Sequence, residues 1–400
     1  MKINVIDLFA GCGGLTDGFL QTGSFNTLAS IDWELPTVNT LKNRLVTKYN
    51  YSKKDAEEKV LYFDIQRIKE LLNGYNDKKY GKSEGLKKII GNQKVDLIIG
   101  GPPCQAYSIA GRVRCANGMK DDYRNFLFES YINVVSEFKP KLFIFENVEG
   151  ILSAMPDDIP ITERMKESFE KIGYFIPKNL RDTALFDLSY YGIPQKRKRV
   201  IIFGVRKDIG NAKIDTFYKN LKSKKRRNTT KSNTVFSKLP KLFPFKNSKN
   251  KRISHAPKTE HDFKNHEPRF HNERDIKIFN ILTKDIENKT FKYTSTEALK
   301  MLYEKQTGKK SNFHKYNVIK KDEPSNTIPA HLYKDGLRHI HPDSEQSRTI
   351  TVREAAKLQS FDDDFEFLGS RGDQYKMVGN AVPPKFAKLI AETILEIENI

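Results

Sequence analysis

The chain has 400 residues, of which 38% are hydrophobic and 11% aromatic, so it can bury more than one core and is not a wholly disordered protein. Lys and Arg outnumber Asp and Glu by 70 to 50, and the net charge of +20 favours a polyanionic partner, most commonly nucleic acid. No apolar run approaches the roughly 20 residues that cross a bilayer, and no signal peptide is recognisable. Three cysteines, an odd number, suit a reducing cytoplasm, where we therefore expect the protein.

The first 205 residues alternate short apolar runs, which are typical of buried strands, with longer amphipathic stretches, which are typical of helices. The predicted strands are 2–9, 95–100, 141–146 and 199–205, and the predicted helices are 36–49, 125–138 and 161–172. This alternation predicts an α/β fold with a doubly wound sheet that binds ligands at the carboxyl ends of its strands. A lysine-rich insertion at 73–94 is expected to form a surface hairpin or a pair of helices.

The composition changes after Val205 to a lysine- and asparagine-rich texture, which indicates a second domain or long insertion. Residues 206–258 contain 17 basic and two acidic residues and carry +15 of the net charge. This stretch is either a surface for a polyanion or a solvated lysine-rich loop. Periodicity returns with predicted helices at 349–361 and 384–397. Four histidines in this region fit no common zinc spacing, so no metal site is predicted: His255, His261, His266 and His271.

The first motif is a glycine-rich turn, 7–14 (DLFAGCGG), which follows a predicted strand and enters a helix. Glycines at such a turn allow the backbone to approach a ligand closely. Asp32 ends the next strand and could hold ribose hydroxyls, and the neighbouring Trp33 could stack on an adenine ring. Asp64 stands at another strand end, where it could accept from an adenine amino group. The series favours an adenosine cofactor and leaves NAD and S-adenosylmethionine open.

The second motif, GGPPCQ at 100–105, follows the predicted strand VDLII. Two prolines hold Cys104 at the carboxyl end of this strand, where a thiol is accessible and can act as a nucleophile once a neighbouring group activates it. The alternative is a small apolar residue in a turn. Cys12 lies among glycines where any small residue would serve, and Cys115 lies in a polar loop without rigid support.

Two further motifs place ionisable side chains next to predicted strands. Glu146 closes the apolar strand KLFIFE, which suits either a proton donor or hydrogen-bonding group for a ring nitrogen, or a helix cap. In the segment 195–199 (QKRKR), Arg197 and Arg199 point to the same side of an extended chain and could enter one site. A solvated charge run is the alternative for this segment.

In this order the motifs resemble the DNA (cytosine-5)-methyltransferase family of bacterial restriction-modification systems. The resemblance covers nearly the whole chain, from DLFAGCGG, IDW, FDI, GGPPCQAYS, ENV and QKRKR to TVREAAKLQSF and GNAVPP. It implies a Rossmann-like S-adenosylmethionine-dependent methyltransferase domain at 1–205, completed by 375–400. It also implies a smaller target-recognition domain at 206–345 and a hinge segment at 346–374.

Carried over to this sequence, the resemblance makes Cys104 the nucleophile that adds to carbon 6 of cytosine. Glu146 would contact ring nitrogen 3 and the exocyclic amine, and Arg197 and Arg199 would hold the base and stabilise the adduct. The resemblance assigns the cofactor S-adenosyl-L-methionine to these residues: Phe9, Gly11, Gly14, Asp32, Trp33, Asp64, Ile65, Pro102, Leu127, Asn380 and Ala381.

Cytosine inside a duplex hides carbon 6, so such an enzyme must flip the nucleotide out of double-stranded DNA. The loop 105–122, with Gly111 and Gly118 as hinges and Arg112 and Arg114 as phosphate contacts, is expected to close over the DNA. We expect a monomer associated with the nucleoid and paired in function with a restriction endonuclease. A tRNA cytosine-5 methyltransferase on the same scaffold is the alternative, but that branch usually carries a cysteine signature in its recognition region, and 206–345 contains no cysteine. A catalytically inactive DNA-binding relative is disfavoured because the catalytic motifs are present.

Overall fold

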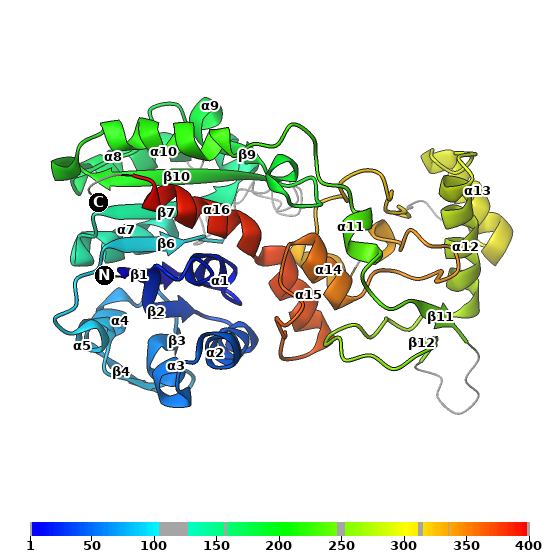
Figure 1. Ribbon diagram of the computed structural model, residues 1–400, viewed down its shortest axis with the longest axis horizontal. Helices are drawn as coiled ribbons and strands as arrows, with labels where there is room; N and C mark the ends of the chain where they lie inside the picture. Colours follow the sequence, from blue (N-terminus) through cyan, green and yellow to red (C-terminus); the bar gives the residue numbers. More distant parts are fainter. Residues whose placement is uncertain are drawn as a thin grey trace. The chain divides into compact units, whose positions relative to one another are not determined.

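The computed structural model describes residues 2–103, 127–155, 158–245, 253–310, 315–334 and 336–397 (Figure 1). The chain divides into two compact units. The first unit comprises Met1–Tyr191, Arg197–Arg227 and Ala381–Ile400, and the second comprises Gly192–Lys196 and Asn228–Asn380. Among the described residues, no helix has both the length and the apolar composition needed to cross a membrane.

The first unit is built on an eight-stranded sheet in the order β3-β2-β1-β6-β7-β10-β8, with β9 also paired to β10. The strands are β1 (Ile3–Leu8), β2 (Phe25–Asp32), β3 (Val60–Tyr62), β6 (Leu97–Gly100), β7 (Leu142–Val148), β8 (Tyr174–Phe175), β9 (Leu185–Asp187) and β10 (Lys198–Arg206). The first five in this order run parallel, and β10 is antiparallel to β7, β8 and β9. The predicted α/β fold is confirmed, and the four predicted strands are β1, β6, β7 and β10.

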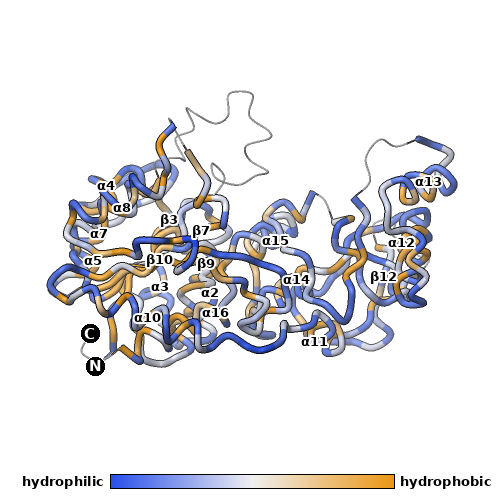
Figure 2. The backbone as a smooth tube through the Cα atoms, turned by 90° about the horizontal axis from the view of Figure 1, so that it is seen from above, coloured by the Kyte–Doolittle hydropathy of each residue, from blue (hydrophilic) through white to orange (hydrophobic). Residues whose placement is uncertain are grey.

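Helices flank this sheet, whose strands contain long hydrophobic stretches (Figure 2). They are α1 (Gly14–Leu20), α2 (Leu35–Tyr49), α3 (Lys53–Lys59), α4 (Ile68–Asn73), α5 (Leu86–Ile90), α7 (Leu127–Phe138), α8 (Ile161–Lys171), α9 (Leu180–Ala184), α10 (Ala212–Ser223) and α16 (Pro384–Leu395). Between α4 and α5, β4 (Tyr75–Asp77) and β5 (Gly81–Ser83) form an antiparallel hairpin within the lysine-rich insertion.

The C-terminal helix α16 packs directly on α1, at the other end of the chain. A Cβ atom at Gly14 would lie 2.3 Å from the carbonyl oxygen of Val382, and one at Gly18 would lie 2.4 Å from that of Pro384. Both distances are far below van der Waals contact, so only glycine permits this approach. The sequence from Ala381 onward thereby becomes part of the first unit.

The unit boundaries differ from those expected from the sequence. Residues 206–227 belong to the first unit because α10 packs on β10: the rings of Phe203 and Phe217 stack 4.2 Å apart, and the Tyr218 hydroxyl lies 2.7 Å from the Ile201 carbonyl oxygen. Conversely, α15 (Arg371–Asn380) belongs to the second unit rather than to the closing segment of the first.

The regular structure in the described part of the second unit is mainly helical and contains one short two-stranded sheet. Its elements are α11 (Asn233–Phe236), β11 (Leu242–Pro244), β12 (His255–Pro257), α12 (Glu273–Glu287), α13 (Thr296–Thr307), α14 (Val352–Leu358) and α15. The α12–α13 pair buries a hydrophobic cluster that includes Ile278, Phe279 and Leu302. The helix predicted at 349–361 is shorter because Thr351 caps α14 and forms a capping box with Glu354.

A buried ion pair organises the polypeptide around α14. Both terminal nitrogens of Arg348 lie 2.6–2.7 Å from the Glu354 carboxylate, and neither residue is more than 1% exposed. This pairing holds the pKa of Glu354 well below its usual range. Since removing one partner leaves the other buried and uncompensated, we infer that this pair tolerates no single substitution.

Two buried histidines nearby are held neutral. Nε2 of His271 accepts from the backbone N–H of Thr349 at 3.2 Å, which requires that nitrogen to be unprotonated. Burial, with the neighbouring imidazole and Arg348, lowers the pKa of His271 to about 3, and burial lowers that of His255 to about 4. At a pH below the ordinary histidine pKa, these two histidines bind protons in the unfolded chain but not in the folded chain.

The second unit should therefore lose stability as the pH falls from about 6.5 toward 4. At pH 4.5 the loss should be on the order of 2 kcal/mol for each histidine. Urea unfolding followed by circular dichroism at pH 7 and pH 4.5 measures it. Replacing His255 and His271 by Gln should flatten this dependence relative to the unsubstituted protein, and an unchanged dependence would contradict the assignment.

Candidate active site

The glycine-rich turn after β1 is held by the Asp32 carboxylate. One of its oxygens accepts from the Gly11 N–H at 2.9 Å, and the other accepts from the Glu34 N–H and the Thr37 hydroxyl, each at 2.9 Å. Phe9 at the start of the turn has a φ of 57°, a left-handed conformation that is strained for a bulky residue. The turn is therefore held in a defined shape by a neighbouring strand. Burial raises the pKa of Asp32.

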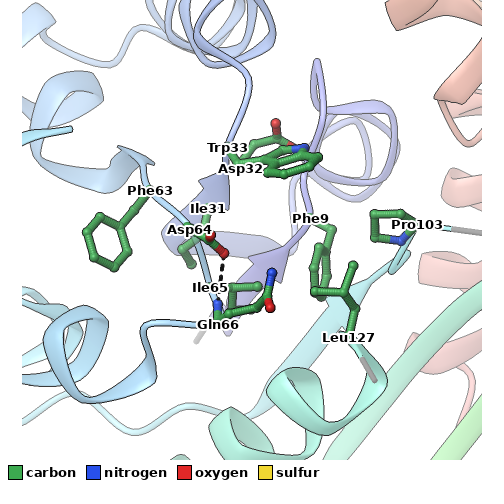
Figure 3. Close-up of a pocket in the computed structure, with 10 residues that line it drawn as sticks. All are labelled: Phe9, Ile31, Asp32, Trp33, Phe63, Asp64, Ile65, Gln66, Pro103 and Leu127. Atoms are coloured by element: carbon green, nitrogen blue, oxygen red, sulfur yellow. Dashed lines mark hydrogen bonds between the residues drawn. The ribbon is translucent and has the colours of Figure 1, made fainter. Parts of the chain in front are cut away.

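A pocket opens beside this turn at the carboxyl ends of β1, β2 and β3 (Figure 3). It encloses about 330 Å³, part of it open to solvent. The lining residues are Phe9, Ile31, Asp32, Trp33, Phe63, Asp64, Ile65, Gln66, Pro103 and Leu127. The mixture of apolar walls with two carboxylates suits a flat heterocycle joined to a polyol. Trp33 is 40% exposed and offers a face of its ring at the rim.

The structure brings together six of the eleven residues predicted to bind the cofactor: Phe9, Asp32, Trp33, Asp64, Ile65 and Leu127 line the pocket. Gly11 belongs to the adjoining turn, and Gly14 is covered by Val382. Pro102 precedes the lining residue Pro103. Ala381 accepts a hydrogen bond from Arg197, and Asn380 belongs to the second unit; neither lines the pocket.

Sequence reasoning missed four lining residues, Ile31, Phe63, Gln66 and Pro103. All four lie within two positions of a predicted residue in the chain. They could have been predicted because they are sequence neighbours of predicted residues such as Asp32, Asp64 and Pro102 at the strand ends.

The segments GPP and ENV, which lie far apart in the sequence, touch at the carboxyl ends of β6 and β7. The side-chain amide of Asn147 donates to the Pro102 carbonyl at 3.2 Å. A Cβ atom at Gly101 would lie 2.8 Å from a carboxylate oxygen of Glu146, so the absence of a side chain lets the backbone pass over this carboxylate.

Glu146 is nearly buried and forms an ion pair with Arg199 of the neighbouring strand β10, with 2.7 Å between Nε and Oε1. Arg197 is 1% exposed and donates to the Ala381 carbonyl at 3.0 Å. Arg199 thus holds the Glu146 carboxylate whereas Arg197 holds a backbone carbonyl, although both arginines belong to the first unit. Cys104, Arg112, Arg114 and the rest of the 105–122 loop lie outside the described residues.

A family model described as C-5 cytosine-specific DNA methylase matches residues 3–396. The chain belongs to this family. As a DNA (cytosine-5) methyltransferase it is 35% identical to the type II methyltransferase M.Bpa9945I of Bacillus paralicheniformis, over 99% of both chains. It is 30% identical to the type II methyltransferase M1.HphI of Haemophilus parahaemolyticus, over 99% of this chain and 88% of the relative.

Solved structures share the fold of this methylase. A protein named as a DNA modification methyltransferase of an E. coli prophage gives a TM-score of 0.64 at 22% identity over 100% of both chains. The Dnmt2 methyltransferase of S. pombe gives 0.57 at 14% identity, again over 100% of both. At these identities the likeness concerns the fold alone.

The basic stretch of the methylase is divided between the two units. Nine of its basic residues and both acidic ones lie in 206–227, within the first unit, and the other eight basic residues lie in the second. Part of the first group is engaged inside its unit, since Arg206 pairs with Asp208 and Lys224 with Glu396. The stretch is therefore shared between two compact units.

Proposed function

We propose that this methylase transfers a methyl group from S-adenosyl-L-methionine to carbon 5 of a cytosine flipped out of a specific DNA sequence, through a covalent adduct with Cys104. The observation that carries the proposal is the contact of the GPP and ENV segments beside the pocket of Asp32, Trp33 and Asp64. A nucleophile, a carboxylate for the base and a cofactor pocket would then share one edge of the sheet.

The pocket residues fit S-adenosyl-L-methionine. A carboxylate offers about four acceptor positions, and the bonds from Gly11, Glu34 and Thr37 use three on Asp32, which leaves room for a ribose hydroxyl. Trp33 would stack on the adenine, and Asp64 would accept from its amino group. When bound, the cofactor supplies an electrophilic methyl group.

The chain's own residues would supply the remaining chemistry. The Cys104 thiolate would add to carbon 6. A proton on the Glu146 carboxyl oxygen that Arg199 does not hold would pass to ring nitrogen 3 and neutralise the negative charge that develops in the ring. Carbon 5 would then form a bond to the methyl group as the bond from that group to the cofactor sulfur breaks, which leaves S-adenosylhomocysteine. A base removes the proton from carbon 5, the bond between sulfur and carbon 6 breaks, and the double bond between carbons 5 and 6 returns. Arg199 would hold the Glu146 carboxylate in place for the base. Arg197 would act near the same ends of strands β7 and β10, where it donates to the Ala381 carbonyl.

Substitution of Asp32 or Trp33 should weaken cofactor binding. Loss of the Trp33 ring removes stacking worth about 1–3 kcal/mol, so Trp33→Ala should raise the Kd for S-adenosyl-L-methionine about five- to a hundredfold, whereas Trp33→Phe should keep most of the affinity. Asp32→Ala should weaken binding further, because the glycine-rich turn also loses its anchor. Unchanged affinity in calorimetry would remove these residues from the site.

For DNA, the basic residues would provide affinity that does not depend on sequence and weakens steeply with salt. Binding energy of this kind would offset the few kcal/mol needed to flip the cytosine. We further propose that the methylase works as a monomer in the cytoplasm, near the nucleoid, and protects host DNA from a cognate restriction endonuclease, as the type II relatives suggest. Target recognition would lie in the predicted region 206–345, of which 228–345 belongs to the second unit.

Bisulfite sequencing of DNA from cells that express the protein tests this function. Methylated cytosines in one recurring sequence are expected. The same treatment of tRNA from these cells tests the alternative substrate, and methylation of tRNA without methylation of DNA would overturn the proposal.

A further inference from the structure

The turn that carries Asp64 into the pocket is short, and directly before it the Phe63 backbone N–H donates to the Asp32 carbonyl at 2.9 Å. The Arg67 N–H bonds to the Asp64 carbonyl at 3.1 Å, and the Gln66 N–H bonds to the Asp64 carboxylate at 3.0 Å. No regular strand continues past Tyr62, since β3 ends there. The position of the Asp64 carboxylate therefore depends on what holds the residues on either side of the turn.

On the first side, the β4–β5 hairpin packs on Phe63. The rings of Phe63 and Tyr75 stack with 3.9 Å between centroids and 18° between planes, and Tyr80 meets Phe63 edge-on at 5.1 Å. Phe63 is 1% exposed, and its ring points away from the space between Phe9 and Trp33 (Figure 3). Thus Phe63 contributes to the pocket wall while its ring is held by the hairpin.

On the other side, the same hairpin holds Arg67. One terminal nitrogen of Arg67 lies 2.7 Å from the Asp77 carboxylate, and its guanidinium lies 5.0 Å from the centre of the Phe63 ring. The other Asp77 oxygen accepts from the backbone N–H groups of Lys79 and Tyr80, which fixes the hairpin turn. The bond from Arg67, with these two, lowers the pKa of Asp77 to about 2, so it is ionised at neutral pH.

The base of the hairpin leaves little freedom. A Cβ atom at Gly85 would lie 2.3 Å from the Gly74 nitrogen, and both glycines have positive φ values of 84° and 108°. The two ends of the hairpin therefore pack closely against each other at Gly74 and Gly85. Its strand β4 contacts both sides of the Asp64 turn, through Tyr75 on Phe63 and Asp77 on Arg67.

We propose that the β4–β5 hairpin clamps the Asp64 turn and so sets the preference of the pocket for the adenine group. Tyr75 and Asp77 are its positioning residues and contact no reacting atom. This inference rests on the proposed function, because it takes Asp64 as the acceptor of the adenine amino group. It assigns a role in the cofactor site to an insertion that otherwise resembles a surface decoration.

Calorimetry with two probes tests the clamp: S-adenosylhomocysteine, which carries the amino group, and S-inosylhomocysteine, which has a carbonyl oxygen in its place. Tyr75→Ala should weaken binding of the adenosyl probe about three- to tenfold. Binding of the inosyl probe should change less than twofold, so the ratio of affinities for the adenosyl probe over the inosyl probe should fall. Asp77→Asn, which weakens the ion pair with Arg67, should also lower the ratio of affinities for the adenosyl probe over the inosyl probe.

Tyr75→Phe keeps the stacked ring and should restore the preference, and Lys82→Ala, an exposed position on β5, should leave it unchanged. The rate at saturating cofactor should stay within twofold of the unsubstituted enzyme for every variant, while the KM for the cofactor rises in Tyr75→Ala. Thermal unfolding measured alongside identifies a variant that fails to fold, in which case Asp77→Asn decides.

Equal losses for both probes, or no loss for either, would overturn the clamp. If the unsubstituted protein bound neither probe, the proposed cofactor, rather than the clamp, would be at fault.

Discussion

Cys104→Ala is expected to lower the rate of methyl transfer by at least about a thousandfold, because in the proposed mechanism the Cys104 thiolate forms the bond to carbon 6. DNA binding should remain within a few-fold, since the substitution removes one small side chain and no charge. Transfer of labelled methyl groups to DNA measures the rate, and a gel-shift assay measures binding.

The other cysteine of the same loop provides a matched control. Cys115→Ala should retain nearly full activity, because the family motif places the nucleophile after Pro102 and Pro103. The unsubstituted enzyme should also form a stable adduct with DNA that contains 5-fluorocytosine, and Cys104→Ala should form none. Appreciable methylation by Cys104→Ala would refute the covalent mechanism.

Glu146→Gln should reduce kcat about a hundred- to ten-thousandfold, the range expected when a group that assists proton transfer is lost. Glutamine keeps the shape of the side chain and can still accept from Arg199, so the β7–β10 edge should stay intact. The affinity for S-adenosyl-L-methionine should not change, because Glu146 does not line the pocket.

Glu149→Gln is the control for this substitution. Glu149 follows the same strand, is 42% exposed and pairs at 3.3 Å with Lys198 on the surface, so its loss should change kcat less than twofold. Single-turnover kinetics at saturating cofactor separates the chemical step from binding. A Glu146→Gln enzyme with a normal rate would mean that this carboxylate only supports the fold.

Much of the pocket proposed for the cofactor could be predicted from the order of the motifs. In a parallel sheet the carboxyl ends of β1, β2 and β3 lie along one edge, so residues that end these strands converge wherever the strands pair. Asp32, Trp33 and Asp64 were predicted in this way, and all three line the pocket. The four strands predicted from long apolar runs are also present, because strands buried on both faces have a distinct composition.

Other features depend on contacts between distant residues that leave no local pattern. The antiparallel direction of β10 follows from its pairing with β7, and the segment 206–227 joins the first unit because Phe217 meets Phe203. The α12–α13 pair was not predicted, because charged and polar residues obscure its apolar positions.

The sequence by itself determined the family, the α/β class and the residues at the strand ends, because these depend on short motifs and on strand composition. Only the tertiary structure decided which partners those residues have. It paired Glu146 with Arg199, gave three of the Asp32 acceptor positions to the chain itself and packed Tyr75 against Phe63. The basic stretch 206–258 is continuous along the chain, but packing divides it between the two units. The sequence shows how much charge the stretch carries, and only the fold shows which residues surround each charge.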